Sequence, residues 1–384
     1  MRKLTTACLP DVAEIIMGQS PPGDTYNEAN VGLPFFQGKT EFGEVSPTPR
    51  KWCNAPKKIA EAGDILISVR APVGPTNLVS TQCCIGRGLA AIRANPEQLD
   101  PSYLRFALRH AEPRLASMGQ GSTFAAIGRA ELAKVEFPLP ALVEQRRIVD
   151  ILSRAEGIVR LRREAEKKAA ELIPALFLDM FGDPATNPKG WRTARLGDMS
   201  EKMSDGPFGS NLKTSHYTDE GVRVIRLQNI GVGYLNDKER AFVSPAHFAT
   251  LPRNHCVPGD VMIGTLGDPN LRAIVIPPSI TEALNKADCV QFRCRPDISC
   301  PEYICWLMNM PSTLMMAASL VQGITLTRIS MGRLRELVVP IPPLAIQLNF
   351  AERVEQVCSI QSQQSVATAT AQATFDALLA QVFN

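Results

Sequence analysis

Two stretches of the sequence decide the fold: QGSTFAAIGRAELAKVEFPLPALVEQ at residues 120–145 and QGITLTRISMGRLRELVVPIPPLAIQ at residues 322–347. Both begin with Gln-Gly, place a Thr two residues later, continue through Ile and Leu, and end in a Pro-x-Pro-x-Leu-x-x-Gln tail. The offset of 202 residues continues without a gap to residue 384, and 15 of the 63 aligned positions are identical. This self-similarity predicts a duplicated unit.

The duplication continues upstream with a smaller offset. GDILISVRAPVG (63–74) resembles GDVMIGTLGDPN (259–270), and DPSYLRFAL (100–108) resembles CPEYICWLM (300–308). The offset grows from 196 to 200 and then to 202, so we expect small insertions in the loops of the upstream portion.

Each half of the chain combines a mixed region with a long helix. β-Branched runs such as DILISVRAPV (64–73) and VRVIRLQNI (222–230) are typical of strands, and many Gly and Pro residues separate them. Residues 142–181 contain only one Gly and one Pro, which predicts a long helix. We therefore expect an α+β protein with an internal repeat, divided into mixed domains and helices at 1–141, 142–184, 185–343 and 344–384.

The first helix carries a heptad-like seam of mostly apolar residues: Ile148, Ile151, Ala155, Ile158, Arg162, Ala165, Ala169, Leu172 and Leu176. The second helix repeats it more weakly at the positions 202 residues later. A narrow seam on a long helix needs a partner, so the pattern predicts that the two helices pack as an antiparallel coiled coil related by pseudo-twofold symmetry. The alternative is that each helix caps its own domain separately. Pro174 is expected to kink or end the first helix near Ile173.

The overall composition limits the class of protein. Of 384 residues, 45% are hydrophobic and 21% charged, values typical of a globular protein with two or three domains. Lys plus Arg is 41 and Asp plus Glu is 38, so the net charge of +3 excludes a polycation and any basic surface must be local. The sequence shows neither a long apolar run nor a secretory signal, so we expect a cytoplasmic protein that does not enter a membrane.

Metal and cofactor motifs are missing from the sequence. The ten cysteines include no Cys-x-x-Cys pair, which argues against a structural zinc site and favours reduced thiols. In GLPFFQGKT (32–40) the first Gly stands one residue too far from Gly-Lys-Thr for a nucleotide phosphate loop. IPPS (276–279) and IPPL (341–344) lack the polar residue and the ring of an amine-methyltransferase loop, and the four histidines form no zinc-protease motif. We expect no catalytic residues, no metal and no cofactor in this chain.

Polar and basic side chains beside glycines recur at matching places of both halves. Arg, Lys, Gln and Asn are the side chains that hold phosphates and read base edges, and glycines allow close approach to a sugar-phosphate chain. A single such residue is more often a solvated surface group, but the recurrence favours a shared role. The candidates are Gln19, Ser20, Gln37, Lys39, Arg70 and Arg87 in the first half and Ser210, Lys213, Arg226, Gln228 and Asn229 in the second.

Several of these stretches resemble one family. The duplicated plan of variable domain and long helix, the helix entry PIPPLAIQ (340–347), FFQGKTEFGE (35–44) and DGPFGSNLK (205–213) resemble the DNA-specificity subunit of type I restriction-modification enzymes. The resemblance covers essentially the whole chain in the expected order. It implies that 1–141 and 185–343 are target-recognition domains and that 142–184 and 344–384 are spacer helices.

The resemblance also implies a function. Each recognition domain would read one half of a split, asymmetric site in double-stranded DNA, and the helices would fix the gap between the half-sites. Two modification subunits that methylate adenine and a restriction subunit with motor and nuclease activity would be the partners. S-adenosylmethionine, ATP and Mg²⁺ would then be bound by those partners only. The charged residues of the first helix would be either a solvated face or contacts to a partner or to spacer phosphates.

Two other classes of function stay open. The chain could be a free-standing fragment of a DNA methyltransferase or nuclease, in which case it would bind S-adenosylmethionine alone. It could also be an antirestriction decoy that occupies modification subunits without reading DNA.

Overall fold

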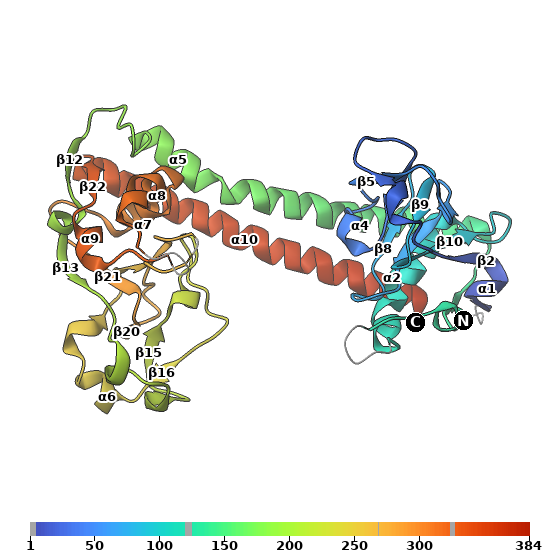
Figure 1. Ribbon diagram of the computed structural model, residues 1–384. Helices are drawn as coiled ribbons and strands as arrows, with labels where there is room; N and C mark the ends of the chain where they lie inside the picture. Colours follow the sequence, from blue (N-terminus) through green and yellow to red (C-terminus); the bar gives the residue numbers. More distant parts are fainter. Residues whose placement is uncertain (1–4, 120–124, 268, 323–326) are drawn as a thin grey trace. The chain divides into compact units, whose positions relative to one another are not determined.

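The structure, a computed structural model, describes residues 5–119, 125–267, 269–322 and 327–384. Apart from Gln322, the two Gln-Gly-x-Thr stretches that begin the sequence repeat lie outside the described residues. The chain divides into two compact units, unit 1 with residues 1–164 and 365–384 and unit 2 with residues 165–364 (Figure 1). Unit 1 is thus built from both ends of the sequence, and unit 2 from its middle.

Unit 1 contains three sheets. The first pairs β1 (Thr6–Cys8) with β11 (Glu136–Pro138), and the second has the order β2 (Ala13–Met17), β10 (Leu89–Ala94), β7 (Ile65–Ser68), β8 (Thr76–Leu78). The third has the order β3 (Tyr26–Asn27), β5 (Lys51–Cys53), β4 (Leu33–Phe36), β9 (Cys83–Ile85), β6 (Ile59–Ala60). All neighbouring strands are antiparallel except β4 and β9, which are parallel.

Unit 2 repeats these three sheets. The first pairs β12 (Arg192–Arg195) with β22 (Val338–Ile341), and the second has the order β13 (Ser200–Ser204), β21 (Cys289–Cys294), β18 (Val261–Gly264), β19 (Ala273–Val275). The third has the order β14 (Tyr217–Thr218), β16 (Phe242–Val243), β15 (Val222–Ile225), β20 (Ala283–Asn285), β17 (His255–Cys256). Its single parallel pair, β15 with β20, stands where β4 and β9 stand in unit 1. The predicted internal repeat is confirmed.

Helices complete each unit. Unit 1 has α1 (Leu9–Val12), α2 (Pro101–Ser117) and α3 (Arg129–Leu132), and unit 2 has α5 (Leu172–Phe181), α6 (Pro245–Ala249), α7 (Pro301–Asn309), α8 (Pro311–Ala317) and α9 (Met331–Arg335). The two long helices, α4 (Leu142–Ala170) and α10 (Leu344–Phe383), each have residues in both units. The helices and sheets match the predicted α+β class. No described helix is long and apolar enough to cross a membrane.

The strand β7 shows why the apolar runs of the sequence become sheet interior. Ile65 and Ile67 pack in one cluster with Tyr103 of α2, whereas Leu66 packs in another with Phe36 of β4. Successive side chains of a strand point to opposite faces, so a run that is apolar at every position is buried on both sides. The second sheet of unit 1 therefore lies between α2 and the third sheet.

The same geometry in both units explains the Gln that ends the repeated motif. Gln145 is fully buried, its Oε1 accepts from Asp100 N at 2.9 Å, and its Nε2 donates to Gln98 O and Pro140 O at 2.8 Å each. Gln347 makes the equivalent three contacts in unit 2. The amide joins the helix entry to the loop before α2 or α7, so the motif stabilises the fold in each unit.

The break in the first long helix lies slightly before the predicted position. α4 ends at Ala170 and α5 begins at Leu172. A proline ring clashes with the carbonyl four residues earlier, which for Pro174 is that of Ala170. The neighbouring carbonyl of Ala169 accepts from Gln361 Nε2 of α10 at 2.6 Å. A side chain of the other long helix therefore stabilises the break.

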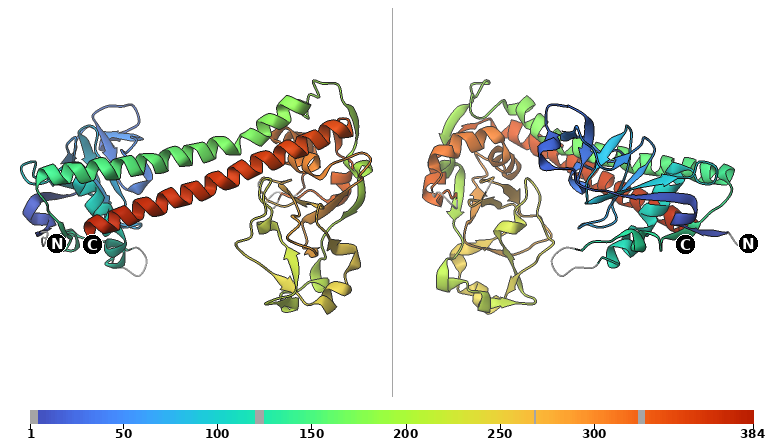
Figure 2. Two further views of the ribbon diagram at one scale, coloured as in Figure 1. Left: turned by 180° about the vertical axis from the view of Figure 1, so that it is seen from behind. Right: turned by 45° about the vertical axis from the view of Figure 1, so that its right-hand side comes forward.

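The long helix α10 contributes to the core of both units. In unit 1, Phe375 and Phe383 of α10 lie 6.2 Å and 5.1 Å from the rings of Phe106 and Tyr103, respectively. The end of α10 (red) lies beside the first part of α4 (green) in both views of Figure 2. The alternative that each helix caps only its own domain is therefore wrong.

The same arrangement occurs in unit 2. Phe350 of α10 makes edge contacts with Phe177 and Phe181 of α5, at 5.7 Å and 5.2 Å between ring centroids. Within each unit the helix directions are opposite. In unit 2 this follows from the contacts, because Ala169 bonds Gln361 while the later Phe177 meets the earlier Phe350. The predicted antiparallel pairing is thus present inside each unit.

The buried seam of α4 keeps Ile148, Ala155 and Ala169 of the predicted set, but the positions between them are shifted by one residue. Ile151 and Ile158 are 41% and 53% exposed, whereas Leu152 and Val159 are 1% and 5% exposed. The prediction considered only the other long helix as the partner. In the structure Leu152 and Val159 also pack in the core that contains α2, so the domain decides which face is buried.

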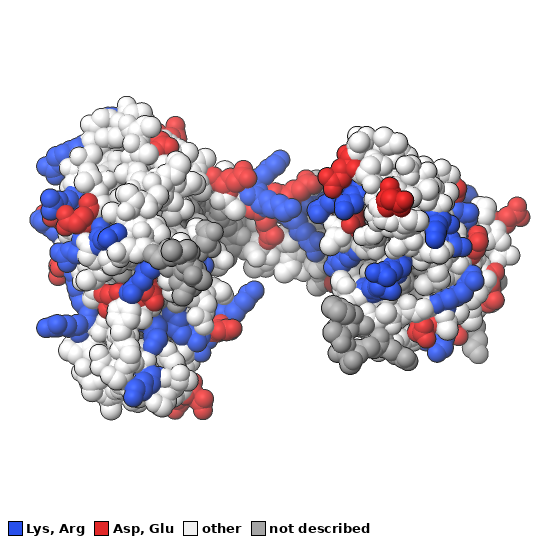
Figure 3. Space-filling view, in the orientation of Figure 1, with Lys and Arg blue, Asp and Glu red and all other residues white. Residues whose placement is uncertain are grey.

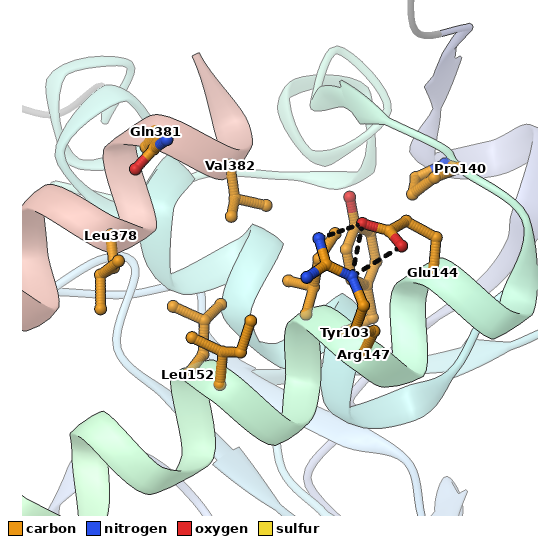
Figure 4. A pocket seen from close by; sticks show the side chains of 10 residues that line it. Tyr103, Pro140, Glu144, Arg147, Leu152, Leu378, Gln381 and Val382 are labelled. Atoms are coloured by element: carbon orange, nitrogen blue, oxygen red, sulfur yellow. Dashed lines mark hydrogen bonds and ion pairs between the residues drawn. The ribbon is translucent and has the colours of Figure 1, made fainter.

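A pocket of about 280 Å³ remains between the two helices at this point (Figure 4). Leu152 of α4 and Leu378 and Val382 of α10 form its apolar wall. Glu144 and Arg147 pair with each other at 2.7 Å along its edge, so they belong to the helix surface.

Candidate nucleic-acid interface

Three segments of unit 1 meet a fourth, the turn between β9 and β10 (86–88), beside the parallel strands β4 and β9. The loop after β2 is held by Gly18 N, which donates to Leu89 O at 2.9 Å. The turn after β4 is held by Phe36 O, which accepts from Gly86 N at 2.8 Å. The strand end after β7 is held by Val69 N, which donates to the carbonyl of Gly88 at 2.9 Å.

Glycines make this convergence possible. A Cβ on Gly18 would lie 2.1 Å from the carbonyl oxygen of Gly86, and a Cβ on Gly88 would lie 2.2 Å from that of Gln37. Both distances are far below van der Waals contact, so these positions require glycine. The close packing of backbones brings the side chains of neighbouring residues to one place.

A pocket of about 360 Å³ opens where the segments meet. It is lined by Ser20, Tyr26, Gln37, Arg70, Arg87 and Gly88, so it unites four of the six residues predicted in the first half. Gln37, Arg70 and Arg87 are exposed, and within the described part of the chain neither guanidinium forms an ion pair. Two free cations and an amide at one concave place can bind phosphates and base edges.

The other two predicted residues of unit 1 lie near this pocket along the chain but outside its lining. Gln19 has an exposed side chain, and its backbone N–H donates to Ile85 O at 3.1 Å. Lys39 stands at the start of the 3₁₀ turn η2 (Lys39–Glu41) and lines a second pocket instead. A direct role of either residue in binding stays a prediction.

The equivalent turn of unit 2 holds three predicted residues. The 3₁₀ turn η6 (Leu227–Asn229) follows β15 as η2 follows β4. The Nε2 of Gln228 donates to Glu239 Oε2 at 3.1 Å, and the guanidinium of Arg226 lies 3.7 Å from the same carboxylate. Both side chains reach the surface but are engaged with Glu239.

Asn229 lies below that surface. It is fully buried, its Oδ1 accepts from Arg226 N at 3.0 Å, and its Nδ2 donates to the carbonyls of Asn236 and Glu239. With no exposed atom left for a base, it stabilises the turn. The prediction that Asn229 itself contacts DNA is not supported by this geometry.

Ser210 and Lys213 lie on the loop after β13, which corresponds to the loop after β2. Both side chains are exposed. The loop is held close to the strand end by Gly206, where a Cβ would lie 1.9 Å from the carbonyl carbon of Lys286. Lys286 Nζ also donates to Leu212 O at 2.6 Å.

The sequence prediction missed Arg328, which lies at the same place in unit 2. Its guanidinium pairs with Asp288 at 2.7 Å and Asp205 at 3.2 Å and lies 4.9 Å from the centroid of the Phe208 ring. Burial raises the pKa of the Asp205 carboxyl against the opposing effects of a backbone hydrogen bond and of Arg328. The Arg328 side chain is still 38% exposed, so it is oriented without being withdrawn from the surface.

In unit 1 the arginine of the equivalent bridge is Arg70, which lies on the other side of the bridge from the position of Arg328. The bridge between Leu266 and Arg328 in unit 2 corresponds to that between Arg70 and Ala126 in unit 1. The signal was available in the sequence, because the offset of 202 aligns Arg328 with Ala126. On the face shown in Figure 3, basic side chains are interspersed with acidic ones over both units, in agreement with the small net charge of +3.

The described residues contain no group of three or more His, Cys, Asp or Glu side chains placed to hold a metal ion. All ten cysteines are free thiols, and burial raises the pKa of Cys83 and of Cys256 to about 12. The buried thiols therefore stay protonated and pack as apolar side chains.

Comparison with known proteins points to one family. The family model described as type I restriction modification DNA specificity domain matches residues 1–171. A protein named putative type I restriction enzyme MjaX specificity subunit, from Methanocaldococcus jannaschii, is 41% identical over 168 residues, which are 43% of this chain and 40% of the relative. The MjaIX specificity subunit of the same organism is 26% identical over 252 residues, 59% of this chain and 57% of the relative. The chain thus spans about half the length of these curated relatives.

Solved structures share the whole fold. A chain from a structure of the type I R-M system, concerned with complex assembly and conformational transition, aligns with a TM-score of 0.66 at 21% identity and covers 100% of this chain and 99% of that one. The S subunit of a type I restriction-modification system from M. genitalium aligns with a TM-score of 0.55 at 16% identity, covering 100% and 96%. Over residues 1–171 the chain is thus similar in sequence to the type I restriction modification DNA specificity domain, and its fold is similar to that of solved chains from type I restriction-modification systems.

Proposed function

We propose that this chain is the DNA-recognition subunit of a type I restriction-modification complex. Each unit reads one half of a split, asymmetric site in double-stranded DNA. The two long helices set the spacer between the half-sites. The chain directs two adenine-methylating modification subunits, and a restriction subunit where one is present, to that site in the cytoplasm.

One observation carries this proposal. In unit 1, polar and basic side chains that the sequence singled out are gathered in one pocket beside the parallel strands β4 and β9, and in unit 2 Arg226 and Gln228 lie on the equivalent turn after β15, which pairs in parallel with β20. The loops differ between the units while the sheets beneath them are the same. A constant scaffold that carries two different sets of reading groups is suited to two different half-sites.

The chain itself makes and breaks no bonds under this proposal. Its relatives are named as specificity subunits, and the proposed interface offers groups that bind DNA and no set of side chains that would activate a nucleophile. S-adenosylmethionine, ATP and Mg²⁺ belong on the partner subunits. The modest net charge of +3 implies that the partners supply many of the phosphate contacts.

The test is methylome sequencing of a host that carries the cognate modification subunit, with and without this chain. We expect a split adenine motif to be methylated only when the chain is present. No new motif in its presence would contradict the proposal.

The two other classes of function give different results. A free-standing methyltransferase would bind labelled S-adenosylmethionine when purified alone and would modify DNA without a partner. An antirestriction decoy would bind modification subunits but give no sequence-selective DNA binding in that complex. We expect neither outcome.

A further inference from the structure

A second pocket of unit 1 is dominated by basic side chains. It has a volume of about 570 Å³ and lies where η2 and β8 meet α2 and α4. Arg105 and Arg109 line it from α2, Arg160 and Arg163 from α4, and Lys39 from η2. We call this pocket the junction cleft.

Its acidic groups neutralise only part of this charge. Besides Glu44 and Glu112, the cleft is lined by Glu156 of α4, which binds both Arg105, at 2.6 Å, and Arg109. Burial raises the pKa of the Glu156 carboxyl, but the hydrogen bonds and charges of the two arginines outweigh it and hold the pKa below its ordinary value. Glu156 is therefore ionised at neutral pH, and one carboxylate there faces two guanidinium groups.

Further cations in the junction cleft are left for a ligand. In the described part of the chain neither Lys39 nor Arg160 makes an ion pair or a side-chain hydrogen bond, although Lys39 lies close enough to Glu112 to oppose the rise that burial causes in the pKa of its carboxyl. Arg163 donates to the neutral side chain of Gln372 at 2.8 Å, which leaves its charge uncompensated. Unpaired cations at a concave surface favour a polyanion.

The fold does not need these charges, because unit 2 lacks them. Tyr103 and Tyr303 make the same hydrogen bond, to Pro138 O and Pro340 O, which aligns α2 with α7 at an offset of 200. At that offset the equivalents of the two α2 arginines are Cys305 and Asn309.

The α4 side of the cleft is neutral in unit 2 as well. The shared contacts of Gln145 and Gln347 align α4 with α10 at an offset of 202. The equivalents of Glu156 and Arg160 are then Cys358 and Ser362. Since the same scaffold folds without the charged set, the charges of unit 1 are available to a ligand.

The place of the cleft indicates which ligand. Lys39 follows Gln37 by two residues, and Gln37 lines the pocket that we propose reads bases. A DNA strand whose bases meet Gln37 has phosphates close to those bases, and Lys39 stands on the same turn. Lys and Arg side chains are the usual partners of those phosphates.

We propose that the junction cleft of unit 1 binds the phosphate backbone of the DNA next to the half-site read by unit 1, independently of base sequence. This inference rests on the proposed function. Under this inference the two units make different numbers of phosphate contacts with DNA. Unit 2 has no such charged set and holds its half-site with the reading loops alone.

The test compares two double variants of the full-length chain. The cleft variant is Lys39→Ala with Arg160→Ser, and the second change installs the residue that unit 2 carries. The control variant is Arg147→Ala with Arg154→Ser, which removes the same charge from exposed residues of α4 that pair with Glu144 and Asp150. Thermal unfolding of all three proteins verifies that they are folded.

The measurement is fluorescence anisotropy with a duplex of arbitrary sequence, about 40 base pairs long, titrated between about 50 and 200 mM salt. Each phosphate contact contributes about 0.9 to the slope of log affinity against log salt, so the cleft variant should lose about 2 from the slope of the wild-type chain. The control variant should keep that slope.

An unchanged slope in the cleft variant would overturn the inference, as would an equal loss in the control or no binding of the duplex by the wild-type chain. The methylome assay is read separately. If the chain directs methylation of a split motif but its cleft variant keeps the wild-type salt slope, the proposed function stands. The junction cleft then has no part in it.

Discussion

The buried amides of Gln145 and Gln347 make the first prediction at the scale of single residues. Gln145→Ala removes three hydrogen bonds and leaves Asp100 N and two carbonyls without partners, so we expect unit 1 to lose about 2–3 kcal/mol of unfolding free energy. Urea denaturation followed by hydrogen exchange in unit 1 measures the loss. The matched control is Glu144→Ala next to it, whose ion pair with Arg147 lies on the exposed helix surface and is screened by solvent.

Glu156 gives a pH-dependent prediction. Its pKa in the folded protein is lowered from 4.5, so its stabilisation is fully present above about pH 4.5 and is lost as the pH falls through the folded value. We expect Glu156→Gln to destabilise unit 1 by about 1–2 kcal/mol at pH 7, because Arg105 and Arg109 would lack a charged partner.

Denaturation of the wild-type chain and of Glu156→Gln at neutral pH and on both sides of pH 4.5 checks this expectation. The difference between the two proteins should shrink below pH 4.5. A constant difference across that range would show that the lost hydrogen bonds, and not the charge, stabilise the unit.

At this scale the sequence predicted some side chains and missed others for physical reasons. Ser20, Gln37, Arg70 and Arg87 were predicted one by one, and the structure brings them together. Asn229 has the same chemistry as a base-reading residue, but only the fold shows that its amide is consumed by the turn.

At the scale of elements, α10 stabilises two different cores. Phe375 meets α2 and carries the guanidinium of Arg109 over its ring at 4.5 Å, whereas Phe350 meets α5. We expect Phe375→Ala to destabilise unit 1 and Phe350→Ala to destabilise unit 2, each by about 3–5 kcal/mol. Hydrogen exchange resolved by segment distinguishes the units. Each variant is the control for the other, and equal loosening of both units by either one would contradict the prediction.

The seam of α4 shows what sequence periodicity can predict. Heptad spacing was enough to predict a long helix and an antiparallel partner, because both depend on a stripe of apolar residues. Heptad spacing alone could not distinguish Ile151 and Ile158 from Leu152 and Val159, because these neighbouring residues are equally apolar, and the prediction chose the pair that the structure leaves exposed. The choice depends on α2, whose position relative to α4 is a tertiary property that no local pattern contains.

The sheets, like the seam of α4, could be predicted only in part. The apolar run at β7 predicted a buried strand, and the offset of 196 between Asp64 and Asp260 was visible in the sequence. Both aspartates bind an arginine of the next strand in their sheet, Arg93 and Arg293. Which strands pair could not be predicted, because strands of two to six residues carry little information about register.

At the scale of the whole molecule, the duplicated plan predicts that the two reading surfaces act independently. Alanine at Gln37 and Arg70 together should relax only one half of the methylated motif, with a cost of about 1–3 kcal/mol for each base reader. Methylome sequencing with the variant chain measures it. If the preference at that half-site stayed unchanged, these residues would not read DNA.

The corresponding change in unit 2 is Arg328→Gln with Gln228→Ala. We expect it to relax the other half of the motif and to leave the first half unaltered. Changes in both halves from either set would contradict independent reading. The matched control is Arg253→Gln, an exposed arginine of unit 2 in the 3₁₀ turn η7 (Pro252–Asn254).

The discontinuity of unit 1 has a consequence for biosynthesis. A ribosome delivers residues 165–364 before residues 365–384, so unit 2 has all its parts while unit 1, although begun first, still lacks Phe375 and Phe383. During that interval the rings of Tyr103 and Phe106 have no cover from α10. A nascent chain stalled before residue 365 should therefore be cut by protease in unit 1 and resist it in unit 2, and the earlier-made unit is the one that depends on chaperones until residues 365–384 have been made.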